Sequence, residues 1–436
     1  MLKLFVNKVT KMITIYSSMP YGNAIELSGN GLSVDTKNIL KKTGRNTGNL
    51  LFHYAATLLS KEKCIFIDSR TKPEIVEKLT SLSKVLIIPL ANILNEEIQV
   101  SGALIRNIKC AQCPIMVLGL GAQAKQSANA EFFSIPKQSQ DFLKIIADKA
   151  IMVSCRGEFT LNVCKKYLGS LPTSFQQFGC PSILISPNPC LGDKIEKNFQ
   201  KIKKSLLKTN KIPRNIIYTV GNIIKFTQNP YEDDPLNKRV AFEDTMMEIL
   251  VMQKRYKSKI VFQTEPFLFS LISKRNASEA KDTLKLISKY FPSINECTDD
   301  CSFSRLEIDR VADMFNVYTS ANNWILNSNR ADLSISSRLH GTIAPLMAEI
   351  PAVCYYHDSR TKELCQSLKL PSSDLSLIHE FSEEGILKSF CKAFEEYDPS
   401  QFNAHRQAYA STIADAFSKV DVTISDHLRS ILSERL

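Results

Sequence analysis

Residues 63–89 of the chain, KCIFIDSRTKPEIVEKLTSLSKVLIIP, decide its fold class. Two short apolar runs, Lys63–Asp68 and Lys84–Pro89, are rich in Ile, Val or Leu and end at polar residues or proline, which predicts buried strands. Between them, Lys72–Leu82 carries apolar residues at helical spacing. A strand, a helix and a second strand in succession predict parallel strands joined by a right-handed crossover.

The same alternation continues along the rest of the chain. Further strands are expected at Pro114–Gly121, Ala150–Ser154, Arg214–Gly221, Lys259–Gln263, Phe315–Thr319, Ala331–Ser336 and Ala352–Tyr356. Further helices are expected at Gln138–Asp148, Glu158–Leu168, Arg239–Tyr256 and Ala277–Tyr290. The alternation stops at Phe178–Pro189, where prolines gather, and at the lysine-rich stretch Lys194–Lys211, which is typical of a solvated helix or a linker.

This pattern predicts an α/β protein with two Rossmann-like, doubly wound domains that face a cleft. We expect an N-terminal domain at 1–185, a linker at 186–210, a C-terminal domain at 211–400 and, at 401–436, a C-terminal helix that packs back on the body. Ligands of such sheets bind beyond the carboxyl ends of the strands, so the loops that leave these ends are where chemistry is expected.

The composition is that of an ordinary globular protein with a surplus of positive charge. The 436 residues include 55 Lys and Arg against 44 Asp and Glu, a net charge of +11, which favours nucleic acid, a lipid surface or a small phosphorylated substrate as partner. Nucleic acid is not expected, because the sequence lacks zinc-finger spacing, an RNP-like aromatic strand and a basic helix with heptads. No apolar run reaches the ~18 residues of a membrane helix, and the N-terminus lacks the apolar core of a signal peptide, so we expect a cytoplasmic protein.

Two patterns resemble cofactor or metal motifs, but we interpret them differently. Gly119–Ala124 matches G-x-G-x-x-A, yet polar residues follow it and lead to Pro136 instead of opening a helix, so no nicotinamide or flavin cofactor is expected. CAQC at 110–113 and CTDDC at 297–301 could together form a four-thiolate zinc site, but neither is flanked by a knuckle-type glycine. We interpret these cysteines as reduced thiols and expect neither a metal nor a cofactor.

Two segments at strand ends carry side chains that can hold an anion or move a proton. Arg156 lies where a strand turns into a helix, a position that fits either a bound phosphate or carboxylate or pairing with a neighbouring acid. In Ala331–Leu364, two successive strand ends present a set of polar side chains to one cleft, namely Arg338, His340, Asp358, Arg360 and Lys362. Histidine suits proton transfer near neutral pH, and one placed between Arg and Gly at a strand end is a better candidate than a lone core histidine.

These segments resemble the polysaccharide pyruvyl transferase family. Ser337–Gly341 (SRLHG), with Pro351 and the Asp358/Arg360 loop after it, resembles the C-terminal signature of the family. Four other pieces resemble family motifs in the same order: Arg45–Asn49 the N-x-G-[DN] loop, Gly119–Gln123 the G-x-G-A-Q loop, Arg156–Thr160 the R-G-E-[YF]-[ST] segment, and Gly179–Ser182 the G-[DC]-P-[AS] boundary. Asn49 replaces the Asp that is common in the first loop, and 188–211 and 292–306 have no recognised counterpart.

The resemblance implies a fold like that of B-type glycosyltransferases and transfer of a pyruvyl group from phosphoenolpyruvate to a sugar, giving a cyclic ketal and phosphate. It implies that His340 is the acid/base and that Arg338 and Arg156 hold the donor's carboxylate and phosphate. The remaining candidates for substrate binding are Ser337, Gly341 and Arg360 on the donor side, and Asn46, Gly48, Asn49, Gly121 and Gln123 on the acceptor side.

Two alternatives remain open from the sequence. A B-type glycosyltransferase with a nucleotide-sugar donor would share the architecture, and the absence of a D-x-D motif argues only against the metal-dependent type. A lysine-rich stretch such as Lys194–Lys211 also fits contact with an anionic membrane, where lipid-linked glycan acceptors reside, so the inner face of the membrane is a second expected location.

Overall fold

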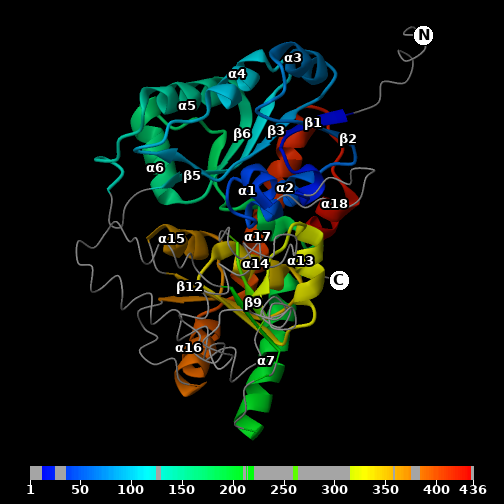
Figure 1. The fold of residues 1–436 in the computed structure, drawn as a ribbon, viewed down its shortest axis with the longest axis vertical. Helices are drawn as coiled ribbons and strands as arrows, with labels where there is room; N and C mark the ends of the chain where they lie inside the picture. Colours follow the sequence, from blue (N-terminus) through cyan, green and yellow to red (C-terminus); the bar gives the residue numbers. More distant parts are fainter. Residues whose placement is uncertain are drawn as a thin grey trace, which may run out of the picture.

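A computed structural model of the protein describes residues 12–24, 36–123, 129–209, 213, 215–219, 259–263, 315–356, 359–374 and 383–433. Within them the chain forms two parallel β-sheets, one in the upper and one in the lower half of Figure 1, with helices around and between them. The α/β class and the two doubly wound sheets are therefore confirmed. The expected helices Arg239–Tyr256 and Ala277–Tyr290 lie outside the described residues.

The first sheet has seven strands and is entirely parallel. Its spatial order is β2 (Lys63–Ile67), β1 (Met12–Tyr16), β3 (Leu86–Pro89), β5 (Ile115–Gln123), β6 (Ala150–Cys155) and β7 (Phe175–Gln177), with β4 (Asn92–Asn95) pairing along the end of β5. β1 lies inside the sheet, with Met12 beside Lys63 and Thr14 beside Leu86. The strand order reverses direction between β1 and β3, which is the switch point of a doubly wound sheet.

Both faces of this sheet are buried, which explains the uninterrupted apolar sequence of its strands. Leu86 and Ile88 of β3 point to one face, and Val85 and Ile87 beside them point to the other. The first face packs against α3 (Pro73–Ser81), α4 (Gly102–Cys110), α5 (Lys137–Lys149) and α6 (Glu158–Leu168). The second face packs against α2 (Asn49–Thr57), the 3₁₀ helix η2 (Pro181–Leu184) and α17 (Pro399–Ser418), and it shares one apolar core with the second sheet.

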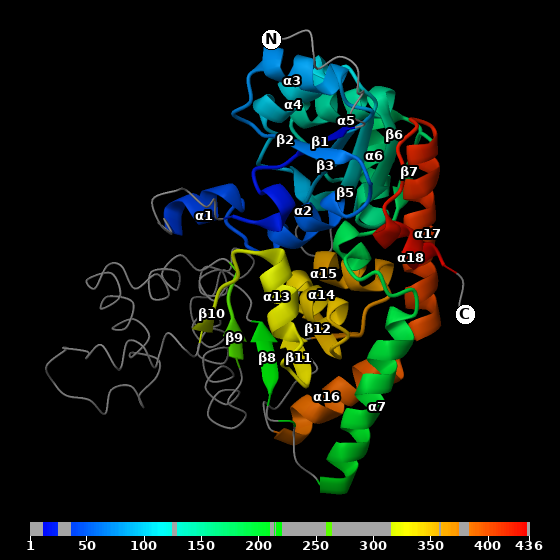
Figure 2. The same cartoon turned by 90° about the vertical axis from the view of Figure 1, so that its right-hand side faces the viewer.

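The second sheet has six parallel strands in the order β10 (Phe315–Asn316), β9 (Lys259–Val261), β8 (Ile216–Thr219), β11 (Leu333–Ser336), β12 (Ala352–Tyr356) and β13 (Ser372–Asp374). This is the Rossmann order, with the switch point between β8 and β11. The connecting helices are α13 (Ala321–Ser328), α14 (Leu339–Met347), α15 (Ser359–Ser367) and α16 (Glu383–Glu395). Figure 2 shows α13, α14 and α15 on the side of the sheet that faces the first half of the molecule.

The segment 186–210, expected as a linker, contains the 19-residue helix α7 (Leu191–Thr209). Its apolar residues Leu191, Ile195 and Phe199 follow each other at four-residue spacing and are buried. Phe199 stacks on Phe394 of α16 with ring centroids 4.2 Å apart. The end of α7 projects beyond the body in Figures 1 and 2.

The C-terminal segment forms α17 and α18 (Asp426–Leu432), and α17 contacts both halves. Its Tyr409 hydroxyl lies 2.7 Å from Ser154 Oγ at β6 of the first sheet. Arg406, fully buried on the same helix, donates to the carbonyls of Ile183 (2.8 Å), Asn188 (2.7 Å) and Ser186. Among the described residues, no helix combines the length and apolar character needed to cross a membrane.

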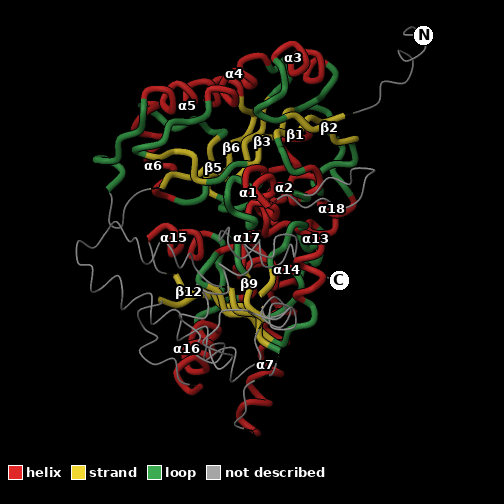
Figure 3. Tube along the Cα trace, viewed as in Figure 1, coloured by secondary structure: helices red, strands yellow, loops and turns green. Residues whose placement is uncertain are grey.

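Several elements were not expected from the sequence: α1 (Thr36–Lys42), α2, α4 and the strands β1, β4, β7 and β13. Figure 3 labels α1, α2, α4 and β1 among them. β1 is only five residues long, and its position inside the sheet comes from pairing with two strands that are distant in sequence. The strand expected at Pro114–Gly121 continues to Gln123 as β5. Gly119–Gln123, which resembles a family loop, is therefore part of a strand, because β4 pairs with it at Gly121, Ala122 and Gln123.

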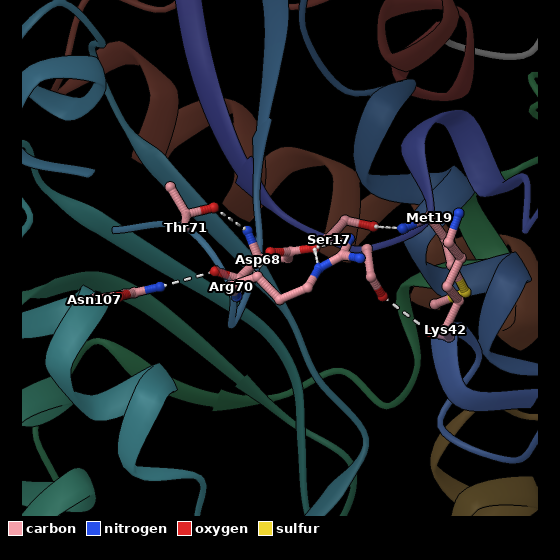
Figure 4. A network of polar contacts seen from close by, with 8 residues as sticks. Ser17, Met19, Lys42, Asp68, Arg70, Thr71 and Asn107 are labelled. Atoms are coloured by element: carbon pink, nitrogen blue, oxygen red, sulfur yellow. Dashed lines mark hydrogen bonds and ion pairs between the residues drawn. The ribbon is translucent and has the colours of Figure 1, made fainter. Parts of the chain in front are cut away.

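A polar network holds the turn that follows β2 (Figure 4). Asp68 Oδ2 accepts hydrogen bonds from Arg70 Nε (3.0 Å) and its terminal nitrogen (2.6 Å), and Thr71 Oγ1 accepts one from the Asp68 amide. Partial burial raises the pKa of Asp68, but the bonds from Arg70 and Thr71 outweigh it and lower that pKa below its ordinary value. Asn107 of α4 donates to the Asp68 carbonyl at 3.0 Å and ties the turn to the neighbouring helix.

Candidate active site

His340 lies in the first turn of α14, immediately after the end of β11. The helix starts close to β8, because the Ser337 amide donates to the Thr219 carbonyl at 3.2 Å. A Cβ on Gly341 would lie 2.4 Å from Ser336 Oγ and 2.5 Å from Thr219 Cβ, so only glycine fits there. This places His340 at the switch point between β8 and β11, the position where open α/β sheets bind their ligands.

The His340 imidazole is buried between segments of both halves of the chain. Its Nε2 lies 3.5 Å from Cys180 Sγ, next to η2. Its Nδ1 lies 2.8 Å from the point where a Cβ on Gly48 would be, and its ring centroid is 5.9 Å from that of Phe52. The Nε2 side of the ring therefore contacts Cys180, and the Nδ1 side faces Gly48.

His340 is held in its neutral form in the free protein. Burial is the main cause that lowers its pKa from 6.5 to about 3, and the positive charges of Arg156 and Arg338 lower it further. A neutral imidazole can accept a proton, and an anion bound between the two arginines would offset their charges and raise this pKa.

Arg156 is buried at the carboxyl end of β6 and is fixed by main-chain groups of the first sheet. Its Nε donates to the Gly119 carbonyl at 3.0 Å, and its terminal nitrogens lie 3.4 Å from Asn92 Oδ1 and from the Leu90 carbonyl. A Cβ on Gly121 would lie 2.8 Å from Arg156 Cδ. The glycine in β5 therefore leaves room for the arginine, and Gln123 at the end of that strand faces Asn95 of β4.

Arg338 is half-buried and is the residue immediately before α14. Ser336 Oγ accepts from the Arg338 amide at 2.9 Å and donates to its carbonyl at 2.7 Å, which fixes the backbone at this point. Arg360 lies in the first turn of α15, but its side chain, like Asp358, lies outside the described part of the chain.

The expected acceptor loop at Asn46–Asn49 is a tight turn that leads into α2. Asn46 Oδ1 accepts from the Gly48 amide at 2.9 Å, and Asn49 Nδ2 donates to the Thr43 carbonyl at 2.9 Å. The Asn49 side chain therefore stabilises the turn, while Gly48 is the residue that approaches His340.

Two neighbours of His340 were not predicted as site residues. Cys180 lies in the G-C-P-S piece, and Gln263 ends the strand expected at Lys259–Gln263. The Gln263 Oε1 atom lies 2.5 Å from the Cβ position of Gly48, on the same side as His340 Nδ1. The only sequence signal for Gln263 was its place at the carboxyl end of a strand.

A comparison with protein-family models identifies the family to which the chain belongs. The model of the polysaccharide pyruvyl transferase family matches residues 46–359, which include the segments described above as part of the site except Arg360. The chain belongs to the polysaccharide pyruvyl transferase family. It is therefore a transferase of polysaccharide biosynthesis, as the SRLHG and R-G-E-F-T pieces predicted.

No curated protein sequence matches the chain. Among solved structures, UDP-GlcNAc 2-epimerase from Neisseria meningitidis is 10% identical, with 93% of this chain and 100% of that chain covered and a TM-score of 0.40. The UDP-N-acetylglucosamine 2-epimerase from Rickettsia bellii is 11% identical (94% and 95% covered, TM-score 0.37). The UDP-GlcNAc 2-epimerase from Methanocaldococcus jannaschii is 10% identical (88% and 92% covered, TM-score 0.36).

The described residues also bear on the cysteine and metal expectations. Cys110 and Cys113 are free thiols, while Cys297 and Cys301 lie outside the described residues. Within the ranges that the structure describes, no three His, Cys, Asp or Glu side chains are grouped closely enough to hold a metal ion.

Proposed function

We propose that this transferase moves the pyruvyl group of phosphoenolpyruvate onto two hydroxyl groups of a saccharide, forming a cyclic ketal and releasing inorganic phosphate. One observation carries the proposal: the buried imidazole of His340 lies within the electrostatic field of Arg156 and Arg338. The site thus combines a proton carrier with two guanidinium groups, which is what a small, dense anion requires when the methylene carbon of its enol phosphate must be protonated.

The arginines serve as the donor clamp. Phosphoenolpyruvate carries a phosphate and a carboxylate, and a guanidinium group can bind either one with two parallel hydrogen bonds. Arg156 and Arg338 take these two groups, and Arg360 adds a third positive charge. The backbone N–H groups between Ser337 and Gly341, at the start of α14, add the field of a helix N-terminus.

His340 carries the protons of the reaction. The methylene carbon of the donor takes up one proton, and the first sugar hydroxyl attacks the adjacent carbon and loses its own. The second hydroxyl then replaces the phosphate at that carbon and also loses its proton. Two hydroxyl protons are released in all: one remains in the new methyl group and the other leaves with phosphate.

The acceptor approaches from the first half of the molecule, beside Asn46, Gly48 and Asn49 and the strand residues Gly121 and Gln123. Hydroxyl groups fit this side because its polar groups are amides and main-chain atoms rather than charges. A lipid can carry the acceptor, and the exposed lysines of α7 would then hold the protein at an anionic membrane surface.

Phosphate release from phosphoenolpyruvate, measured across a panel of galactosides and N-acetylmannosamine, tests the proposal. We expect wild-type turnover with at least one acceptor and a loss of about 10²–10⁴-fold in His340→Gln. Arg338→Lys keeps the charge but loses the bidentate geometry, so its KM for phosphoenolpyruvate should rise about tenfold or more.

A thermal shift distinguishes the nucleotide-sugar alternative. Stabilisation by phosphoenolpyruvate and not by UDP-sugars supports pyruvyl transfer, because only a bound ligand raises the melting temperature. Stabilisation by UDP-sugars alone, or wild-type turnover in His340→Gln, contradicts the proposed function.

A further inference from the structure

Buried polar atoms without hydrogen-bond partners surround the start of α14. Within the described residues, Thr47 Oγ1, Gln263 Nε2 and Thr219 Oγ1 are buried and lack a partner, and their residues are at most 1% exposed. An unsatisfied buried donor or acceptor destabilises the folded protein, so such atoms are rare without a reason.

Thr47 and Gln263, which carry two of these atoms, come from opposite halves of the chain and are neighbours in space. The Thr47 amide donates to the Gln263 carbonyl at 2.9 Å. Gln263 Oε1 and His340 Nδ1 lie 2.5 Å and 2.8 Å from the same point, the Cβ position of Gly48. The side-chain amide of Gln263 and the Nδ1 atom of His340 therefore lie on the same side of Gly48 and close to each other.

The unpaired groups indicate the chemistry of a ligand that would satisfy them. Gln263 Nε2 can only donate, whereas the Thr47 hydroxyl can donate or accept. Neither carries a charge, so they do not add to the anion-binding function assigned to Arg156 and Arg338. A sugar hydroxyl matches them, because its oxygen accepts from an amide while its proton goes to a second oxygen or to a neutral imidazole.

We propose that Gln263 and Thr47 form a hydroxyl-binding subsite that holds the acceptor saccharide beside His340 Nδ1. The subsite rests on the proposed pyruvyl transfer and assigns to it a residue of the second sheet, whereas the sequence placed the acceptor on the first half alone. A hydroxyl held between the Gln263 amide and His340 Nδ1 has its proton oriented toward His340 and its oxygen toward the donor.

The unsatisfied atoms permit a test that separates binding from folding. Gln263→Met and Thr47→Val keep the side-chain shapes and remove the unpaired polar groups, so the melting temperature without ligand should stay equal or rise. Thr173→Val and Gln176→Met, at exposed positions, serve as matched controls. Methyl glycosides of galactose, glucose, mannose, N-acetylglucosamine and N-acetylmannosamine are the probes, with and without phosphoenolpyruvate.

We expect at least one glycoside to stabilise the wild type and both controls, and to bind about tenfold or more weakly to Gln263→Met and Thr47→Val. Binding of phosphoenolpyruvate should be unchanged in all four variants. The subsite is overturned if no glycoside stabilises the wild type, if both site variants bind it as the wild type does, or if the site variants melt well below the wild type.

The two proposals fail in different ways. If glycosides bind and depend on Gln263 but no phosphate is released from phosphoenolpyruvate, the donor is wrong and the saccharide subsite stands. If phosphate is released with unchanged acceptor KM in both site variants, pyruvyl transfer stands and the subsite is wrong.

Discussion

The folded protein lowers the pKa of His340 and so disfavours its protonation. Its pKa falls from 6.5 in the unfolded chain to about 3 in the folded protein, first through burial and then through Arg156 and Arg338. Between these two values the unfolded chain binds more protons than the folded protein, so acid favours unfolding in this range. The contribution of the neutral imidazole to stability is complete above pH 6.5 and is progressively lost as the pH falls toward 3, because the unfolded chain becomes protonated in this range.

This gives a prediction on stability. The free energy of unfolding of the wild type, relative to His340→Gln, should fall by about 1.4 kcal/mol for each pH unit below 6.5. Urea unfolding at several pH values between 4 and 8 measures the difference, and the other buried histidines cancel because both proteins contain them. Parallel curves for the two proteins would show that His340 titrates normally.

At the scale of the element, α14 is the part of the fold that presents the site. It starts within contact distance of β8, and its second and third residues are His340 and Gly341. The carboxyl ends of three strands meet there. Thr219 is the last residue of β8, Ser336 is the last residue of β11, and Gln263 lies two residues after the end of β9. The Rossmann strand order brings these ends together.

Gly341→Ala should displace this helix start. The added Cβ would meet Ser336 Oγ at 2.4 Å and Thr219 Cβ at 2.5 Å, and such overpacking costs about 1–3 kcal/mol. The matched control is Gly102→Ala in the first turn of α4, where the nearest atom is 3.6 Å away, so the change should be neutral or slightly stabilising. Thermal unfolding and phosphate release, measured on both variants, check the pair; equal melting temperatures would refute the close approach.

At the scale of the whole molecule, the site is complete only when both sheets are in place. Glu363 of α15 accepts from the Phe159 amide at the start of α6 at 2.5 Å, next to Gly157 and Arg156. Burial raises the pKa of Glu363, and this contact with an amide of the first sheet's helix lowers it in part. Together with α17, such contacts hold the arginine of one half against the histidine of the other.

The surface of α7 carries a stripe of exposed lysines, Lys194, Lys197, Lys201, Lys204 and Lys208, spaced three or four residues apart. This spacing places them along one face of the helix, and Lys194 also lies 3.9 Å from Glu349. Each lysine near an anionic membrane contributes about 1 kcal/mol to binding, and salt screens that attraction.

We therefore expect the protein to sediment with vesicles that contain phosphatidylglycerol at low salt, and to be released at high salt. Replacing Lys197, Lys201, Lys204 and Lys208 by Gln should abolish sedimentation. The same exchange at four exposed lysines is the control and should preserve it: Lys72, which precedes α3, Lys78 of α3, Lys109 of α4 and Lys144 of α5. Equal loss in both variants would assign the effect to net charge rather than to α7.

Much of the architecture could be predicted because its signals are local. The strands at 63–68, 84–89 and 352–356 are short apolar runs, and burial on both faces of a parallel sheet requires such runs. β1 was missed because MITIY is short and includes two polar side chains, and only its two partners make it a central strand. The sequence does not predict that β5 continues to Gln123, because the pairing with β4 is not visible in either segment alone.

The sequence by itself determined the two-sheet α/β class, the family, and the position of Arg338 and His340 at the end of a strand, because each depends on neighbouring residues. Only the tertiary structure decided that Gly48, Cys180 and Gln263 meet around the His340 imidazole. Their contacts depend on strand order and on how the two sheets pack, and these follow from burial summed over the whole chain rather than from any local pattern. The same packing produces the unpaired polar atoms beside His340, which no sequence motif marks.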